Sequence, residues 1–361
     1  EFLNFFQSMV MNCGRGSEIG VTRFSHLTLR KIQEDYGEEY ETLNQYVNRA
    51  KTSSEQDIVH YVGKETLFMD YLWTIGYYLT LQTDGSLEIM FPSFHDSIIN
   101  EKNKSNSKVA AMFTRAFKSI RNLSEHYCDE NTVLDIESSI EEFSIKHLHT
   151  SDGFNAHGAK KLGIKTLGDL LTISIQDISM RGGWALKSFN TFFDYWVGSL
   201  PSSVRTGKLI GGWRQVLGQG YHGGSPPTLD DIVDEQDKVP NFVDQWLGIH
   251  RNVDSNLKNM LVANMLRHWD ETIEIISKEP SGMYSGGKHV RHPFFSKVHE
   301  ACHYSGISLQ TLDGWVESVR KGFIKRNIVS MSRMDCEEVG YDGATVDARS
   351  FLEVSESNSK Q

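Results

Sequence analysis

The sequence is poor in cysteine and proline, and it lacks any long apolar run. Four cysteines and seven prolines occur in 361 residues. The cysteines are far apart and form no Cys-x-x-Cys pair, so we expect a reduced, intracellular setting rather than a disulfide-based fold. No stretch approaches the ~18 consecutive apolar residues that a membrane span needs. The chain begins at Glu1 rather than at a methionine, and we expect a further N-terminal segment.

Positive charge is also scarce. Lys and Arg number 37 against 47 Asp and Glu, which gives a net charge of -10. Such a balance disfavours nonspecific binding to nucleic acid, but phosphate contacts depend on local clusters of charge. One stretch, 102–121, contains no Asp or Glu and indicates either a DNA-binding segment or a solvated helix face. Its six cations are Lys102, Lys104, Lys108, Arg115, Lys118 and Arg121.

Apolar residues make up 39% of the chain and aromatic residues 11%, which suffices for a large core. Their spacing predicts a mainly α fold with a small antiparallel β-sheet. Strand-like runs are expected within 21–32 and 57–62, separated by a polar segment at 33–55. The segment 84–106 is expected to be loop or short strand, followed by polar linker. Helices are expected within 1–20, with a tight turn at Gly14, and at 68–81, 109–123, 132–148, 156–172 and 186–198, with one long helix over 257–276.

Glycine and proline cluster at 218–227, and an acidic run follows at 230–237. Such a break predicts a domain boundary. We therefore expect a first domain over 1–226, a helical second domain over 227–328, and a flexible polar tail over 329–361.

Two motifs in the first 60 residues carry cations suited to phosphate. Arg15 follows Asn-Cys-Gly and precedes Gly-Ser-Glu, so the end of a helix would present it. The planar guanidinium fork of arginine can hold two phosphate oxygens at once. Lys51 would lie at the tip of a β-hairpin, from which a lysine can reach a DNA groove or a leaving oxygen. Each motif also has a structural explanation, as a helix C-cap followed by a surface arginine and as a solvent-exposed turn lysine.

Two further motifs lie beyond residue 150. His157 and Lys160 are three residues apart, which places both on one face of a helix. Trp184 ends the run Met-Arg-Gly-Gly-Trp, and Tyr195 flanks an aromatic stripe of helical spacing. Histidine can move protons near neutral pH, and a tyrosine hydroxyl can act as a nucleophile. An ordinary helix start and a boundary tyrosine are the structural alternatives.

Taken in order, Arg, Lys, His-x-x-Lys, Gly-Gly-Trp and Tyr resemble the tyrosine recombinase family of the phage-integrase type. The resemblance covers about residues 1–200, and the Gly-Gly-Trp form is most similar to crypton-like mobile-element recombinases of eukaryotes. It implies a tyrosine-recombinase-like catalytic domain in 1–226 and an accessory role for 227–328. It further implies double-stranded DNA as the partner, self-association on that DNA, and a nuclear location.

The resemblance also implies a role for each motif residue. Arg15 and Lys160 would clamp the scissile phosphate, and Tyr195 would attack it to form a 3′-phosphotyrosyl bond. Lys51 would protonate the departing 5′-oxygen, His157 would assist proton movement, and Trp184 would pack on the site and donate its indole N–H. Because side chains supply the cations and the covalent bond stores the energy for rejoining, the reaction requires no metal and no cofactor.

One departure from the family pattern bears on activity. The second arginine of the family is Lys160 here, and lysine keeps the charge but loses the bidentate fork. A second register would place Asp152 and Asn155 at the His and Arg positions, but it loses both chemical groups. The departure leaves open a rival reading, in which the chain is a catalytically inactive DNA-binding protein derived from a recombinase.

The C-terminal part offers a second candidate for DNA contact. Over 294–326, two expected helices meet at Gly306, and Ser308 would cap the second. This pattern is typical of a helix-turn-helix and equally of an ordinary helical hairpin. The nearby residues His289, His292, His299, Cys302 and His303 do not form a zinc-binding spacing, so no metal is expected.

Overall fold

A computed structural model describes most of an N-terminal part, 2–99, most of a C-terminal part, 223–327, and several shorter segments between them. The described residues are 2–33, 39–49, 54–64, 67–99, 111, 159–160, 162–164, 167, 174–183, 200–213, 215–216, 220–221, 223–277 and 292–327.

Helices predominate, as the sequence predicts. In chain order the α-helices are α1 (Phe2–Met11), α2 (Gly16–Ile19), α3 (Tyr71–Leu81), α4 (Pro92–Ile99), α8 (Ile175–Arg181), α10 (Leu200–Ile210), α11 (Val239–Leu247), α12 (Ser255–Arg267), α13 (Trp269–Ser277), α14 (Pro293–Ser305) and α15 (Leu309–Asn327). Short 3-10 helices are η1 (Phe24–His26), η2 (Leu67–Met69), η4 (Leu229–Asp231) and η5 (Gln236–Lys238). The strands are β1 (Leu27–Ile32), β2 (Tyr40–Arg49), β3 (Ser54–His60), β4 (Gln215–Val216) and β5 (Gly220–Tyr221).

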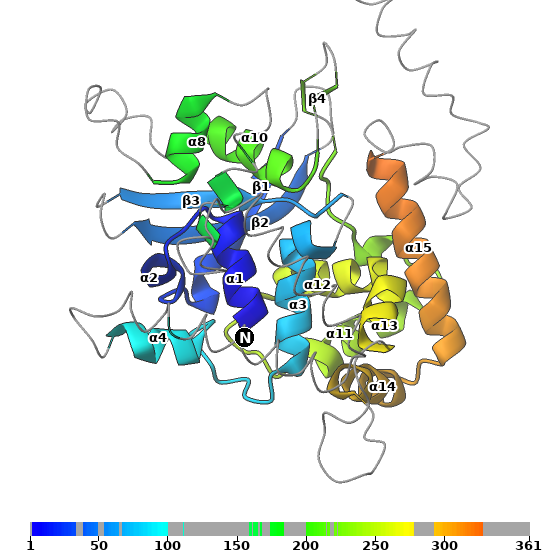
Figure 1. The fold of residues 1–361 in the computed structure, drawn as a ribbon. Helices are drawn as coiled ribbons and strands as arrows, with labels where there is room; N and C mark the ends of the chain where they lie inside the picture. The colour runs from blue at the N-terminus through cyan, green and yellow to red at the C-terminus, as the bar shows by residue number, and fades with distance from the viewer. Residues whose placement is uncertain are drawn as a thin grey trace, which may run out of the picture.

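The main sheet has three antiparallel strands in the order β1-β2-β3. Its register pairs Leu27 with Gln45 and Leu43 with His60, and the β2–β3 ladder ends with Arg49 opposite Ser54. The predicted β-hairpin is therefore confirmed, and Lys51 belongs to its connection. Figure 1 shows the sheet with α8 and α10 along the side of β3.

The central strand β2 lies within the segment 33–55, for which the sequence indicated only a polar composition. Thr42, Asn44 and Gln45 are buried in it, although each is polar. Thr42 donates to the carbonyl of His60, and the amide of Asn44 donates to the carboxylate of Asp57. Because these donors find acceptors within the fold, polar residues can occupy a buried strand.

Two expectations about secondary structure are corrected. The segment 84–106 contains helix α4, whose Phe94 stacks on Phe5 of α1 with ring centroids 3.8 Å apart. The long helix expected over 257–276 is two helices, α12 and α13. They are separated at His268, whose backbone (φ -96, ψ 27) departs from the helical conformation. Helices α8 and α10 were not predicted.

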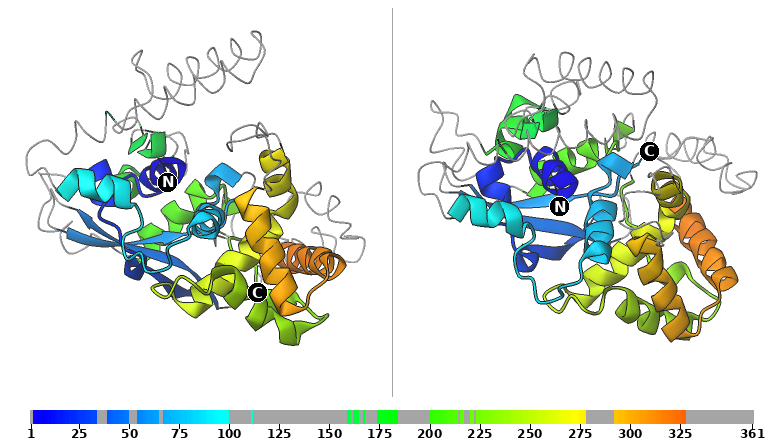
Figure 2. Two further views of the ribbon diagram at one scale, coloured as in Figure 1. Left: turned by 90° about the horizontal axis from the view of Figure 1, so that it is seen from below. Right: turned by 60° about the horizontal axis from the view of Figure 1, so that its bottom comes forward.

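One continuous hydrophobic core joins the two parts of the chain. Buried side chains from α1 to α15 belong to the same cluster. Helix α3 lies at the junction, with α1 on one side and the C-terminal helices on the other (Figures 1 and 2). Gly76 permits the close approach of α12, since a Cβ there would lie 3.0 Å from the sulfur of Met265.

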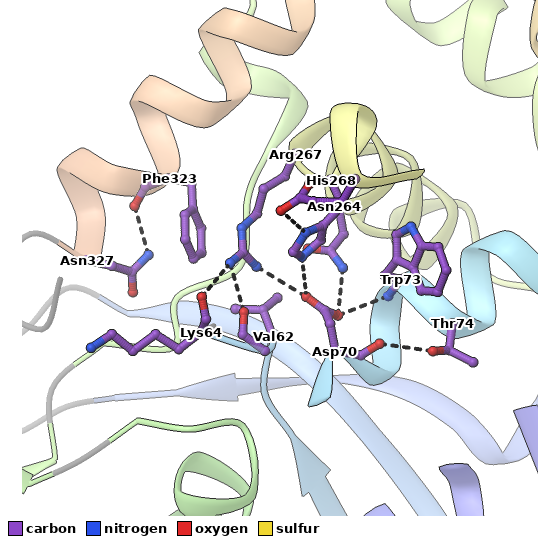
Figure 3. Close-up of polar contacts among 12 residues, drawn as sticks. Val62, Lys64, Asp70, Trp73, Thr74, Asn264, Arg267, His268, Phe323 and Asn327 are labelled. Carbon is purple, nitrogen blue, oxygen red and sulfur yellow. Dashed lines mark hydrogen bonds and ion pairs between the residues drawn. The ribbon is translucent and has the colours of Figure 1, made fainter. Parts of the chain in front are cut away.

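A buried polar cluster ties α3 to the C-terminal helices (Figure 3). The Asp70 carboxylate, fully buried, caps α3 by accepting from the amide of Trp73 at 3.0 Å. It also accepts from Asn264 at 2.7 Å, from Arg267 at 3.2 Å and from the ring of His268 at 3.0 Å. Although burial raises the pKa of Asp70, the bonds and charges from His268 and Arg267 outweigh it and lower the pKa.

Arg267 connects the buried polar cluster to the last helix, α15. Its guanidinium lies 3.8 Å from the ring centroid of Phe323 in α15 and donates to the carbonyl of Gly63 at 2.8 Å (Figure 3). Among the described residues, no helix combines the length and the apolar character that crossing a membrane would require.

Candidate functional site

Arg15 stands at the turn between α1 and α2, as its motif predicts. Helix α1 ends at Met11, and the amide of Gly14 donates back to the carbonyl of Met9 at 2.9 Å. Cys13 takes the left-handed conformation (φ 47), which reverses the chain direction. Arg15 is then the extended residue from which α2 starts.

Glu18 fixes the orientation of Arg15. The Glu18 carboxylate accepts from the backbone amide of Arg15 at 2.8 Å and from its Nη1 at 2.7 Å. The Glu18 side chain is 1% exposed and that of Arg15 is 26% exposed. A buried carboxylate thus anchors one edge of the guanidinium while the rest of the side chain reaches the surface. This is the disposition that an anion-binding arginine needs.

A layer of buried polar groups lies beneath this turn. The amide of Asn12 donates to the carbonyl of Ser8 at 2.8 Å and to Gln45 at 3.0 Å, and its oxygen lies 3.2 Å from Nε2 of His60. Burial, and then the positive charge of Arg181, hold the pKa of His60 well below its usual value. His60 is therefore neutral at pH 7 and donates from Nε2 to Asn12. This layer connects the turn of Arg15 to the central strands of the sheet.

Arg181 and Ser203 close the free edge of β3. The amide of Val59 donates to the Ser203 hydroxyl at 2.8 Å, and the carbonyl of Val59 accepts from Nη1 of Arg181 at 3.1 Å. Nε and Nη2 of the same guanidinium donate to the carbonyl of Met11 at 3.1 and 2.7 Å. An edge strand needs partners for its outward-facing backbone groups, and here α8 and α10 supply them.

Lys160 lies behind the turn rather than on the surface. Its side chain is buried, and its ammonium donates to the carbonyl of Gly182 at 2.7 Å. The helical residues 162–164 pack against the end of α1, because a Cβ on Gly163 would lie 2.2 Å from the carbonyl oxygen of Val10. The segments that carry Arg15, Lys160 and the Arg-Gly-Gly turn therefore meet around the last turn of α1. Lys160 donates to a backbone carbonyl there, whereas the resemblance implied that it would contact a phosphate directly.

The remaining predicted site residues lie outside the described residues. In the chain, Lys51 lies between the paired residues Arg49 and Ser54, and Trp184 directly follows Gly183. The residues in question are Lys51, His157, Trp184, Tyr195, Lys102, Lys104, Lys108, Arg115, Lys118 and Arg121.

Sequence reasoning missed Arg181 and His60 as parts of this region. Arg181 stood in the Met-Arg-Gly-Gly-Trp motif but was assigned no role. The buried amphiphilic strand that carries His60 shows no signal that a histidine in it would contact the arginine turn. The position of Arg181, at the end of a helix and before two glycines, is the one feature that could have pointed to a capping side chain.

The C-terminal hairpin forms as predicted. Gly306 ends α14 in the left-handed conformation (φ 64), and the hydroxyl of Ser308 accepts from the amide of Thr311 at 3.0 Å. Two arginines of the second helix form ion pairs. Arg326 forms two bonds to Asp231, and Arg320 pairs with Asp270.

The first part of α15, residues 309–319, contains no Lys or Arg, which favours an ordinary helical hairpin over a DNA-recognition helix. Within the described part of the chain, no three potential metal ligands gather, and His292 instead caps α14 through the amide of Phe294.

No protein-family model, no curated protein and no solved structure is significantly similar to this chain.

Proposed function

We propose that this chain is a site-specific recombinase or integrase that cuts and rejoins DNA through a 3′-phosphotyrosyl intermediate. The observation that carries the proposal is the meeting of three motif segments around the last turn of α1. They hold Arg15, Lys160 and the Arg-Gly-Gly turn that precedes Trp184, and they are up to 167 residues apart between Arg15 and Gly182. The meeting of these ordered motifs at one point supports a shared site.

In the proposed reaction, Arg15 holds a non-bridging oxygen of the scissile phosphate while Glu18 fixes its guanidinium. The Tyr195 hydroxyl attacks phosphorus, so that the Tyr–O–P bond forms and the bond from phosphorus to the 5′-oxygen breaks. His157 takes up the tyrosine proton, and Lys51 supplies one to the 5′-oxygen. Rejoining reverses these steps. Trp184 packs against the phosphate and donates its indole N–H.

Lys160 contributes differently from a direct clamp in this proposal. With its ammonium on the carbonyl of Gly182, it acts through its positive charge and by holding the turn before Trp184. The same observation supports the second candidate function, a DNA-binding protein that no longer cuts. Such a protein would keep Arg15 at the surface and use Lys160 only to stabilise the fold.

A nicked-substrate experiment separates the two candidates. A pool of duplexes with a randomised core and a nick is incubated with the chain, and covalent protein–DNA adducts are isolated under denaturing conditions. A nick next to the cut lets the short 5′-fragment diffuse away, which traps the phosphotyrosyl bond. We expect adducts with the wild type and none with Tyr195→Phe, with DNA binding nearly unchanged because only the attacking oxygen is removed.

The matched control is Tyr304→Phe, since the Tyr304 side chain is 67% exposed at the end of α14. It should form adducts at the wild-type rate. Salt-sensitive duplex binding without any adduct would replace the recombinase by the binding protein. Failure to bind any duplex at low salt would refute both functions.

A further inference from the structure

We propose that Arg181 is the positioning residue that aligns the motif segments of the candidate site, an inference that rests on the proposed function. Its side chain is 4% exposed, so it does not reach DNA and takes no part in the chemistry itself. It instead donates to the segments of Arg15 and of the Lys51 hairpin, and the peptide that follows it contacts Lys160.

The first contact is to the segment of Arg15. Nε and Nη2 of Arg181 both donate to the carbonyl of Met11, the last residue of α1. Carbonyls at a helix C-terminus lack donors within the helix, and a cation there is favourable for the helix dipole. Arg15 follows only four residues later, across the turn at Cys13. The guanidinium therefore determines where that turn begins.

The second contact is to the hairpin of Lys51. Nη1 of Arg181 donates to the carbonyl of Val59 in β3, on the free edge of the sheet. One planar group thus bridges α1 and β3 at a set distance and angle. A lysine could not do so, because a single ammonium on a flexible stem does not reproduce the fixed fork of a guanidinium.

The third and fourth contacts run through the next peptide. The carbonyl of Gly182 accepts from Lys160, three residues after His157. The amide of Gly182 closes α8 on Ile178, and Gly183 takes φ 64. Trp184 follows at once. Arg181 and Gly182 therefore contact the segment of Arg15, the Lys51 hairpin and Lys160, and they lie just before Trp184 in the chain.

The consequence is mechanistic, because phosphoryl transfer depends on alignment. A displacement of about 1 Å of a catalytic group can slow a reaction about 100-fold. Loss of the Arg181 fork would let the Arg15 turn, the hairpin and the Gly-Gly-Trp turn shift relative to one another. It would do so without removing any group that contacts DNA.

Arg181→Lys tests this inference, with Arg267→Lys as the matched control. Both arginines are buried, both donate to backbone carbonyls, and both variants keep the charge, but Arg267 lies in the α3–α12 junction. Two quantities are measured on the full chain: adduct formation on the nicked duplex pool, and hydrogen exchange of the amides of 12–14. For Arg181→Lys we expect about 100-fold slower adduct formation, duplex affinity within a few-fold of wild type, and faster exchange at 12–14. For Arg267→Lys we expect none of these three changes.

Either of two results would overturn the inference. Unchanged exchange at 12–14 in Arg181→Lys would show that Arg181 does not hold the turn. Faster exchange with wild-type adduct formation would show that the alignment does not matter to the reaction. A wild-type chain that forms no adduct refutes the proposed function instead, and the exchange comparison then decides the role of Arg181 without reference to cleavage.

Discussion

Two buried arginines mark the two regions on which this protein is built, and they are used in different ways. Arg267, at the junction of α3 with the C-terminal helices, pairs with the buried carboxylate of Asp70 and stacks on Phe323. Arg181, at the candidate site, donates to the backbone carbonyls of Met11 and Val59. At the junction, opposite charges join helices. At the candidate site, a cation joins α1 to β3 through neutral backbone dipoles.

The two regions also differ in how their buried titratable groups are held. At the junction the Asp70 carboxylate keeps a lowered pKa because cations surround it. At the site, burial first and then the charge of Arg181 hold the pKa of His60 well below its usual value. Opposite charges therefore stabilise the junction, whereas at the site a cation rests on neutral backbone carbonyls. The predictions below test this contrast, starting from the largest expected effect.

The junction should be the more sensitive region to loss of one charge. Asp70→Asn removes the carboxylate and leaves Arg267 buried beside His268, which we expect to lower the free energy of unfolding by about 3–5 kcal/mol. Urea denaturation at pH 7 measures this change. Asp313→Asn, at an exposed position of α15, is the control and should change it by less than about 0.5 kcal/mol. Equal losses in the two variants would mean that the junction does not depend on the ion pair.

Packing at the site should be the next most sensitive feature. In Gly163→Ala the new methyl group would lie 2.2 Å from the carbonyl oxygen of Val10, a backbone atom that cannot rotate away. We expect a loss of about 1–3 kcal/mol in the free energy of unfolding. Gly314→Ala is the control, because nothing lies within 4 Å of its added Cβ in helix α15. It should stabilise the chain by about 0.5–1 kcal/mol. If Gly163→Ala left the free energy of unfolding unchanged, residues 162–164 would not pack against α1 as described.

The two regions should also lose stability in different pH ranges. His60 has a depressed pKa when folded, so its contribution is present above the unfolded value of 6.5 and declines as pH falls below it. Asp70 also has a depressed pKa, and its contribution declines only as pH falls below 3.8. The free energy of unfolding, measured from pH 8 to pH 3 (about the range that both groups span), should show both declines.

His60→Gln should remove part of the upper decline, which is at most about 1.4 kcal/mol per pH unit for one proton. Asp70→Asn should remove part of the lower one. The same slope below pH 6.5 in His60→Gln and in wild type would contradict the assignment of that decline to His60.

Much of the architecture could be predicted from the spacing of apolar residues and from the residues that form turns. The aromatic helix α3, the hairpin around Lys51 and the turn at Gly306 follow from local patterns that need no distant partner. The start of strand β2, away from the hairpin turn, was not expected, because its buried polar residues depend on hydrogen bonds to β3 and to Asn12. The break at His268 was missed for a similar reason. The ring of His268 bonds to Asp70, which is 198 residues away in sequence.

The sequence by itself determined the helical content, the hairpin, and a set of ordered residue types that resembles a recombinase motif. Local propensity and side-chain chemistry suffice for these, because each depends on neighbours along the chain. Only the tertiary structure decided that Lys160 faces a carbonyl and that Arg181 bridges α1 to β3. Hydrogen bonds of this kind join residues more than a hundred positions apart, or reach a backbone group that every residue possesses, so no sequence pattern encodes them.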